Sequence, residues 1–322
     1  MNLIKKRIII PRFIYIFVLL VCLIPIKNVL AQTVTNTGTD VRGDFILEPG
    51  KIEVFLNPGE SVVKNISVTS RIGKNTKFKI VTEDFVGTQD ITTPVLLLED
   101  DSSPYSFKKN IEPSTDTFSL SASQKIQIPV KISVPIDAAP GGYYSSVIVA
   151  SLPDEDAGAD QAGTKIVSRI GALFFIRVNG PVDTKGSLED FRAKGATPGI
   201  IQGSPITFEI LYRNSGSIHL VPYGIIKIKN LIGKEVGSVP VDAYFSLPNS
   251  LRYRQVDFAR DNLFGRYTAT LTLNKGYGNT DDVMKVAFWV IPWKLILVSV
   301  SILLLIVSGV YLFGRKFELK KK

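Results

Sequence analysis

Along most of the chain, apolar residues alternate with polar residues at a period of two, in short runs separated by turn residues. The clearest run is QKIQIPVKISVP, which places five β-branched residues on one side: Ile126, Ile128, Val130, Ile132 and Val134. This alternation predicts a β-strand with one face in a core and the other in water. Pro129 lies on the polar side, and because proline cannot donate a hydrogen bond to a neighbouring strand, it favours an edge strand.

Similar runs cover the rest of the body, and no stretch before Phe288 keeps a helical period. Further predicted strands are KIEVFL, SVVKNISVTS, KFKIVTEDF, GALFFIRV, ITFEILYRN, SLRYRQVDF and GRYTATLTL, and GIIKIKN forms a hairpin with EVGSVPV. Each half of the body offers roughly six to eight short strands, the number typical of an immunoglobulin-like sandwich. The prediction is an all-β fold with two tandem immunoglobulin-like β-sandwich domains, at 40–180 and 184–290.

The pattern changes at the C-terminal end of the chain. Leu295 to Phe313 is a run of nineteen residues without charge or proline. As a helix it would be about 28 Å long, close to the roughly 30 Å hydrocarbon core of a bilayer. A transmembrane helix is therefore predicted at 291–314. The residues expected at the two membrane–water interfaces are Trp289, Trp293 and Lys294 on one side, and Tyr311, Arg315 and Lys316 on the other.

The N-terminal segment 1–31 combines basic residues, an apolar run and small residues before Gln32, which is typical of a secretory signal peptide. The alternative is a signal anchor that is not cleaved. Lipidation at Cys22 is disfavoured, because Val21 is not a small residue. The tail 315–322 is basic, and basic flanks stay in the cytoplasm. We expect a single-pass type I cell-membrane protein with its N-terminus and body outside.

Composition supports this organisation. The formal net charge of +9 comes from the two ends: without the leader, the tail and Lys294, 27 basic and 28 acidic residues remain. The body is nearly neutral, which argues against nucleic-acid binding. Cys22 is the only cysteine, so the exported body must be stabilised by its apolar cores without disulfides.

Residues able to support catalysis or metal binding are few. His219 is the only histidine and has no nucleophilic serine motif to serve, and the adjacent carboxylates Glu83 and Asp84 cannot face each other across a cleft. The acidic loop Asp154–Asp160 does not have the ligand spacing of a calcium loop. We predict no catalytic, cofactor or metal site, and no enzyme.

Two aromatic doublets remain, Tyr143–Tyr144 and Phe174–Phe175. Because neighbours in a strand point to opposite faces, one aromatic of each pair should lie in the core and the other should be exposed or at an interface. The alternative is a sheet that is covered on both faces. Tyr143 and Tyr144 are accordingly candidates for partner binding.

The order of these segments resembles that of the bacterial WxL-interacting surface proteins. The resemblance rests on LEPGKIEVFLNPGESVVKNISVTS, SLSASQKIQIPVKISVPIDAAPGGYYSSVIVA and RIGALFFIRVNG in the first half. In the second half it rests on RNSGSIHLVPYGIIKIKN, LPNSLRYRQ, GRYTATLTLNKGYG and FWVIPWK. It implies a peptidoglycan-binding immunoglobulin-like domain, a second β-sandwich domain that binds partners, and a C-terminal anchor.

Two functions are therefore considered. The first is a non-enzymatic, membrane-anchored surface protein whose sandwiches bind cell wall (peptidoglycan) or another surface protein. The second is a structural subunit of a membrane-bound secretion or assembly complex, acting by strand addition at a sheet edge and by helix contacts at Ser308–Gly309. In both, the short segment Asn179–Lys185 predicts a rigid junction between the two domains.

Overall fold

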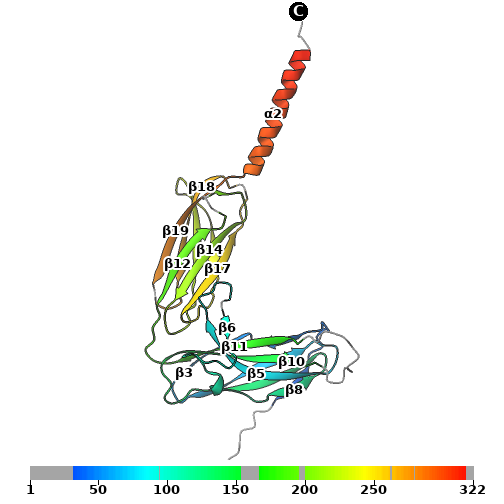
Figure 1. Ribbon diagram of the computed structural model, residues 1–322, viewed down its shortest axis with the longest axis vertical. Helices are drawn as coiled ribbons and strands as arrows, with labels where there is room; N and C mark the ends of the chain where they lie inside the picture. The colour runs from blue at the N-terminus through cyan, green and yellow to red at the C-terminus, as the bar shows by residue number, and fades with distance from the viewer. Residues whose placement is uncertain are drawn as a thin grey trace, which may run out of the picture.

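The computed structural model describes residues 32–93, 95–153, 167–195, 200–261, 263–278 and 280–316 (Figure 1). The predicted signal peptide at 1–31, the acidic loop Asp154–Asp160 and residues 317–322 of the basic tail lie outside these ranges. The described chain is built of β-strands followed by one apolar C-terminal helix, so the all-β prediction is confirmed. The strands form four sheets, which pack in two pairs.

The first pair of sheets is formed by the N-terminal half. One sheet has the order β1 (Thr33–Asn36), β9 (Gln124–Ser133), β4 (Ser61–Ser70) and β2 (Phe45–Glu48), with β7 (Ile111–Pro113) also paired to β9. The other has the order β3 (Lys51–Leu56), β11 (Arg169–Val178), β10 (Gly141–Ser151), β5 (Thr76–Gly87) and β6 (Val95–Leu97), with β8 (Thr117–Leu120) paired to β5. The short helix η1 (Lys108–Asn110) precedes β7.

The first core lies between these two sheets. It contains the apolar side of β9 that the alternation predicted, from Ile126 to Val134, packed with Phe78, Ile80 and Phe174. The prediction that β9 is an edge strand is wrong, because β4 pairs with one side of it and β1 and β7 with the other. Pro129 is tolerated because it falls between the stretches of β9 that pair with β1 and with β7.

The second pair of sheets is formed by the C-terminal half. A three-stranded sheet has the order β12 (Gly186–Ala193), β14 (Ile206–Asn214) and β17 (Ser250–Phe258). The facing sheet has the order β13 (Ile200–Ile201), β19 (Asp281–Val290), β18 (Gly265–Asn274), β15 (Tyr223–Asn230) and β16 (Glu235–Val241). The predicted hairpin is present, since β15 and β16 pair in antiparallel fashion. In the second core the Phe191 ring stacks on Phe208, with centroids 5.6 Å apart, and Phe208 meets Phe288 edge to face at 5.8 Å.

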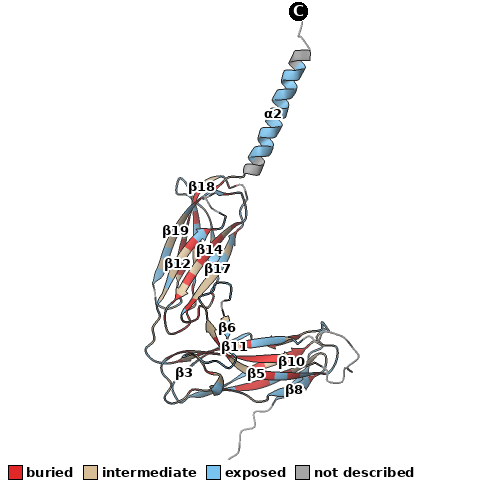
Figure 2. Ribbon diagram, in the orientation of Figure 1, coloured by how far each residue is buried: buried red, intermediate tan, exposed pale blue. Residues whose placement is uncertain are grey.

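The helix α2 (Trp293–Lys316) begins only two residues after β19 ends. Over Ile296–Phe313, α2 is long and apolar enough to cross a membrane, and the described residues contain one such helix. Its side chains in that stretch are exposed and contact neither sandwich (Figure 2). An apolar helix without a protein covering is what a bilayer would bury.

The two sandwiches meet at an elbow, with the second standing over one end of the first (Figure 1). Seven residues, 179–185, connect β11 to β12. Hydrogen bonds fix both ends of this connection: Asn179 N donates to Leu56 O at 2.9 Å, and Ser217 N donates to Asp183 O at 2.9 Å. The chain therefore has little freedom to bend between the sandwiches.

Candidate functional site

An aromatic cluster joins the two sandwiches. Phe85, Tyr144 and Phe175 lie on neighbouring strands of the first sandwich, on the sheet face turned away from the first core, and all three are fully buried. The β16–β17 loop of the second sandwich supplies Phe245 and Leu247, and the Phe175 and Phe245 ring centroids are 5.1 Å apart. We call this cluster the junction. Its burial shows that the second sandwich covers part of that sheet face.

The junction accounts for the two aromatic doublets. Phe174 lies in the first core and Phe175 in the junction, as strand alternation predicts. Tyr143 packs at the edge of the first core, and its hydroxyl donates to Ala139 O at 2.9 Å. Tyr144 is buried in the junction, where its hydroxyl accepts a hydrogen bond from His219 N at 2.6 Å. The structure thus places the two tyrosines on opposite faces of the sheet, and the ring of Tyr144 packs within the chain itself.

The histidine of the second sandwich also belongs to the junction. His219 is buried, its ring centroid is 4.9 Å from that of Phe175, and its Nε2 lies 2.8 Å from Glu53 Oε1 on β3. The pKa of Glu53 is lowered from 4.5 to about 2, chiefly by the hydrogen bond from His219 and also by Lys51, against the opposing effect of burial. This contact acts as a polar link between the sandwiches.

The β5–β6 hairpin makes a second close contact with the second sandwich. Leu251 N donates to Thr88 O at 2.9 Å, and the side chain of Gln89 donates to Asn249 O at 2.6 Å. A Cβ added at Gly87 would lie 2.5 Å from the Cβ of Ser250. Only glycine permits this approach.

Beyond the junction, the same sheet face opens into a groove with a volume of about 490 Å³. Leu173 and Ile148 line it from β11 and β10, and Val95 and Leu97 line it from β6. Gly50 and Gly171 provide no side chains, which leaves the groove hollow. Such a volume is in the range of roughly 300–1,000 Å³ found for ligand sites.

Two polar residues line the groove, and both of them contact Glu83. Ser146 is buried, and its hydroxyl donates to Glu83 O at 3.1 Å. Arg169 Nη2 lies 2.7 Å from Glu83 Oε1. The remaining lining is apolar or glycine, and Leu97 is 41% exposed. A ligand would therefore find mainly apolar surface in the groove, with the guanidinium of Arg169 as its one exposed charged group.

Of the predicted membrane-interface residues, Trp289 lies at the α2 end of the second sandwich, Trp293 and Lys294 open α2, and Arg315 and Lys316 close it. Trp289 is 46% exposed near the end of β19. The side chains of Trp293, Lys294, Arg315 and Lys316 lie outside the described part of the structure. Within the described residues, no group of three or more His, Cys, Asp or Glu side chains could hold a metal ion.

The groove was not predicted from the sequence, although the sequence contains a signal for it. In β10 and β11, GGYYSSVIVAS and RIGALFFIRV carry apolar residues on both faces instead of alternating. Such strands indicate a sheet that is buried on both faces. The pattern does not say which part of the second face is covered by the chain itself and which part stays open.

Comparisons with known proteins give similarity to solved structures alone: no family model and no curated protein matches the sequence. The chain is similar to the class 5 fimbriae chaperone CfaA, at 14% identity and a TM-score of 0.38, over 76% of this chain and 99% of that chain. It is also similar to the E. coli chaperone DraB, at 11% identity and a TM-score of 0.34, over 76% and 98% of the two chains. Likenesses at these values do not indicate what this chain binds.

Proposed function

We propose that this chain is a non-enzymatic, membrane-anchored protein that binds an apolar segment of another surface protein in the groove of its first sandwich. In this proposal the body is two tandem immunoglobulin-like domains, 40–180 and 184–290, held outside the cell membrane by α2. The resemblance to WxL-interacting proteins implies the same arrangement.

The observation that carries the proposal is the chemistry of the groove. Its lining is mostly apolar or glycine, and its two polar residues, Ser146 and Arg169, both contact Glu83. A peptidoglycan strand presents hydroxyl, amide and carboxylate groups, most of which would lose water on entering such a groove without gaining partners. Leucine-like or aromatic side chains of a protein would gain free energy from the same burial. Of the two ligands predicted from the sequence, the groove favours the protein.

The proposal is tested with two groove variants and one matched control. Gly50→Val fills the groove, because a Cβ at Gly50 has no atom within 4 Å, and Leu97→Ser removes part of an exposed wall. Gly203→Val makes the same change in an equally open position on the second sandwich. None of the three should disturb a core.

Full-length protein in detergent would be used to capture partners from solubilised cell envelopes, with washed peptidoglycan as a parallel target. We expect wild type and Gly203→Val to retain the same protein, and Gly50→Val and Leu97→Ser to bind it about tenfold more weakly, or about 1.4 kcal/mol. Retention of that protein by all variants alike, or binding to peptidoglycan alone, would contradict the proposal.

A further inference from the structure

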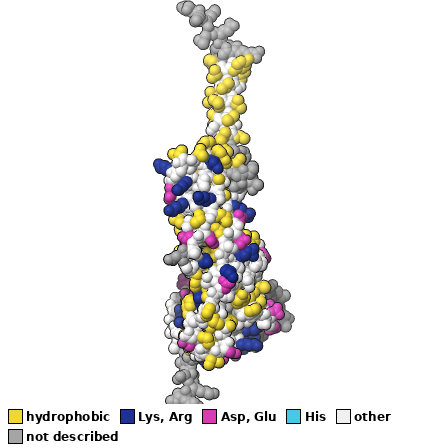
Figure 3. Space-filling model, turned by 90° about the vertical axis from the view of Figure 1, so that its left-hand side faces the viewer, with side chains coloured by type: hydrophobic (Ala, Val, Ile, Leu, Met, Phe, Trp, Pro, Cys, Tyr) yellow, Lys and Arg dark blue, Asp and Glu magenta, His cyan; other side chains and the backbone are white. Residues whose placement is uncertain are grey.

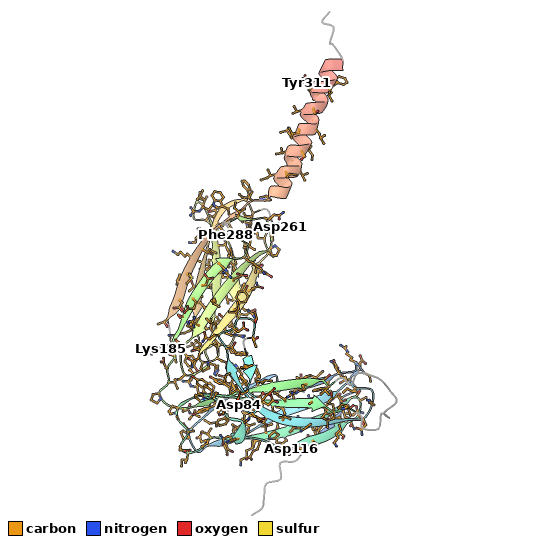
Figure 4. The ribbon with its side chains drawn as sticks, in the orientation of Figure 1. Asp84, Asp116, Lys185, Asp261, Phe288 and Tyr311 are labelled. Carbon is orange, nitrogen blue, oxygen red and sulfur yellow. The ribbon has the colours of Figure 1, made fainter. Side chains whose placement is uncertain are left out.

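The end of the second sandwich that faces α2 carries exposed apolar side chains. Gly265, at the start of β18, pairs with Val290, at the end of β19, and α2 begins shortly afterwards. Hydrophobic side chains gather where the helix leaves the sandwich (Figure 3). Figure 4 places Asp261, in the loop before β18, beside the start of α2 and places Lys185 at the opposite end.

Two features make up this surface. The first is a row across three strands: Ile200 pairs with Trp289, and Trp289 pairs with Arg266. All three side chains are exposed, Ile200 by 43% and Trp289 by 46%. The second is Phe264, which directly precedes β18 and is 68% exposed. We call these four residues the membrane-proximal patch.

The backbone of Phe264 is held in place. Its N–H donates to the hydroxyl of Tyr267 at 3.2 Å, and the same hydroxyl donates to Phe264 O at 3.2 Å. Tyr267 is itself buried in the second core, stacked 6.0 Å from Phe288. The turn therefore presents an aromatic ring outward on a fixed backbone, which is unfavourable in water.

We propose that the membrane-proximal patch docks on the lipid surface of the membrane that α2 crosses. The proposal rests on the membrane anchoring proposed above. Aromatic rings favour the headgroup level of a bilayer, and an arginine beside them can pair with lipid phosphates while its stem stays with the apolar groups. The exposed charges nearby are Arg260, Asp261 and Arg266, so the loop is not repelled by an anionic surface.

This contact would seat the second sandwich on the bilayer. The patch is continuous with α2, and two residues separate β19 from the helix. With Phe264 and Trp289 both inserted, the sandwich could not swing about that short connection. The elbow would then hold the groove of the first sandwich at a set orientation above the membrane.

Spin labelling of the full-length chain in phospholipid nanodiscs tests the proposal. Cys22 is the only cysteine, so Cys22→Ser gives a background in which Phe264→Cys carries a single nitroxide. Tyr223→Cys is the matched control: it is also an exposed aromatic, 49% exposed, and it pairs with Asn274 at the opposite end of the sandwich. Collision rates with oxygen, which enters lipid, and with a nickel chelate, which stays in water, report the depth of each label.

We expect the ratio of oxygen to nickel collisions to be several-fold higher at position 264 than at position 223. Equal ratios in protein that has entered the discs would overturn the docking proposal and leave the anchor intact. Failure of the protein to enter the discs would instead refute the anchor, and the docking with it. A label at 264 that is shielded from both reagents, and more so in discs holding two copies, would assign the patch to a second copy of the chain and overturn the lipid assignment.

Discussion

At the scale of single residues, the polar link between His219 and Glu53 differs from the other contacts of the junction. Its two atoms are 2.8 Å apart, and the residues are 166 positions apart in sequence. Glu53 also pairs with Lys51, whose Nζ lies 3.0 Å from Oε2 and 4.6 Å from the centre of the Phe175 ring. One carboxylate thus connects a buried histidine to a cation on its own strand.

This arrangement predicts how stability depends on pH. The hydrogen bond from His219, together with Lys51, lowers the pKa of Glu53 from 4.5 to about 2. A carboxyl with a lowered folded-state pKa contributes stability that is fully present above pH 4.5 and is lost as pH falls toward 2. Glu53→Gln should therefore lower the free energy of unfolding by about 1–3 kcal/mol at pH 7. The difference from wild type should shrink below pH 4.5.

Urea unfolding of the full-length chain in detergent, at a series of pH values, measures this difference. Glu112→Gln removes an exposed carboxyl on β7 and serves as the control. A difference between wild type and Glu53→Gln that stays constant from pH 7 to pH 2 would show that the charge of Glu53 plays no part in joining the sandwiches.

At the scale of elements, the β5–β6 hairpin has two roles. Val95 and Leu97 on β6 line the groove, and the turn that follows Gly87 contacts the second sandwich. Arg213 Nη1 donates to Gln89 Oε1 at 3.0 Å, so β14 also holds this turn. The wall of the groove is consequently positioned by the second sandwich as well as by its own sheet.

Gly87→Val should release the hairpin. Its new Cβ would lie 2.5 Å from the Cβ of Ser250 and 2.8 Å from that of Leu247, atoms fixed to the backbone that cannot turn away. We expect a loss of about 1–3 kcal/mol in the free energy of unfolding. The amide of Leu251, which donates to Thr88 O, should also exchange its hydrogen faster in hydrogen–deuterium exchange. Unchanged exchange, matching the control Gly203→Val, would mean that the hairpin does not depend on this contact.

At the scale of the whole molecule, the junction makes one body of two sandwiches that each have a separate core. Phe175 is central to it, with ring contacts to Phe85, Tyr144, His219 and Phe245. Because several aromatic rings are buried in this contact, the two sandwiches should not move as hinged bodies relative to each other. The groove, beside the junction, and the membrane-proximal patch, at the opposite end of the second sandwich, are therefore held at a fixed relation.

Phe175→Ala should uncouple the sandwiches. Removal of a fully buried phenylalanine costs about 3–5 kcal/mol, and here that loss falls on the contact between the two cores. We expect calorimetry of the full-length chain to change from one unfolding transition to two. Phe55→Ala removes an exposed ring from β3 and should leave the single transition intact. Two transitions already present in wild type would contradict the coupling.

The sequence by itself determined the strands, the hairpin of β15 and β16, and the apolar C-terminal helix. These are local properties: a period of two, a turn between two such runs, or nineteen uncharged residues can each be read without knowing what lies nearby in space. Strand alternation also separated Phe174 from Phe175, and Tyr143 from Tyr144, correctly assigning members of each doublet to opposite faces.

Only the tertiary structure decided what covers those faces. Alternation predicts that Phe175 and Leu173 lie on the same side of β11. It does not predict that the second sandwich covers Phe175 while Leu173 lines the open groove. The edge assignment from Pro129 was wrong for the same reason, because the number of neighbours of a strand is set by pairing with distant segments. The contacts of His219 with Glu53 and of Gly87 with Ser250 join residues more than a hundred positions apart, and no local pattern records them.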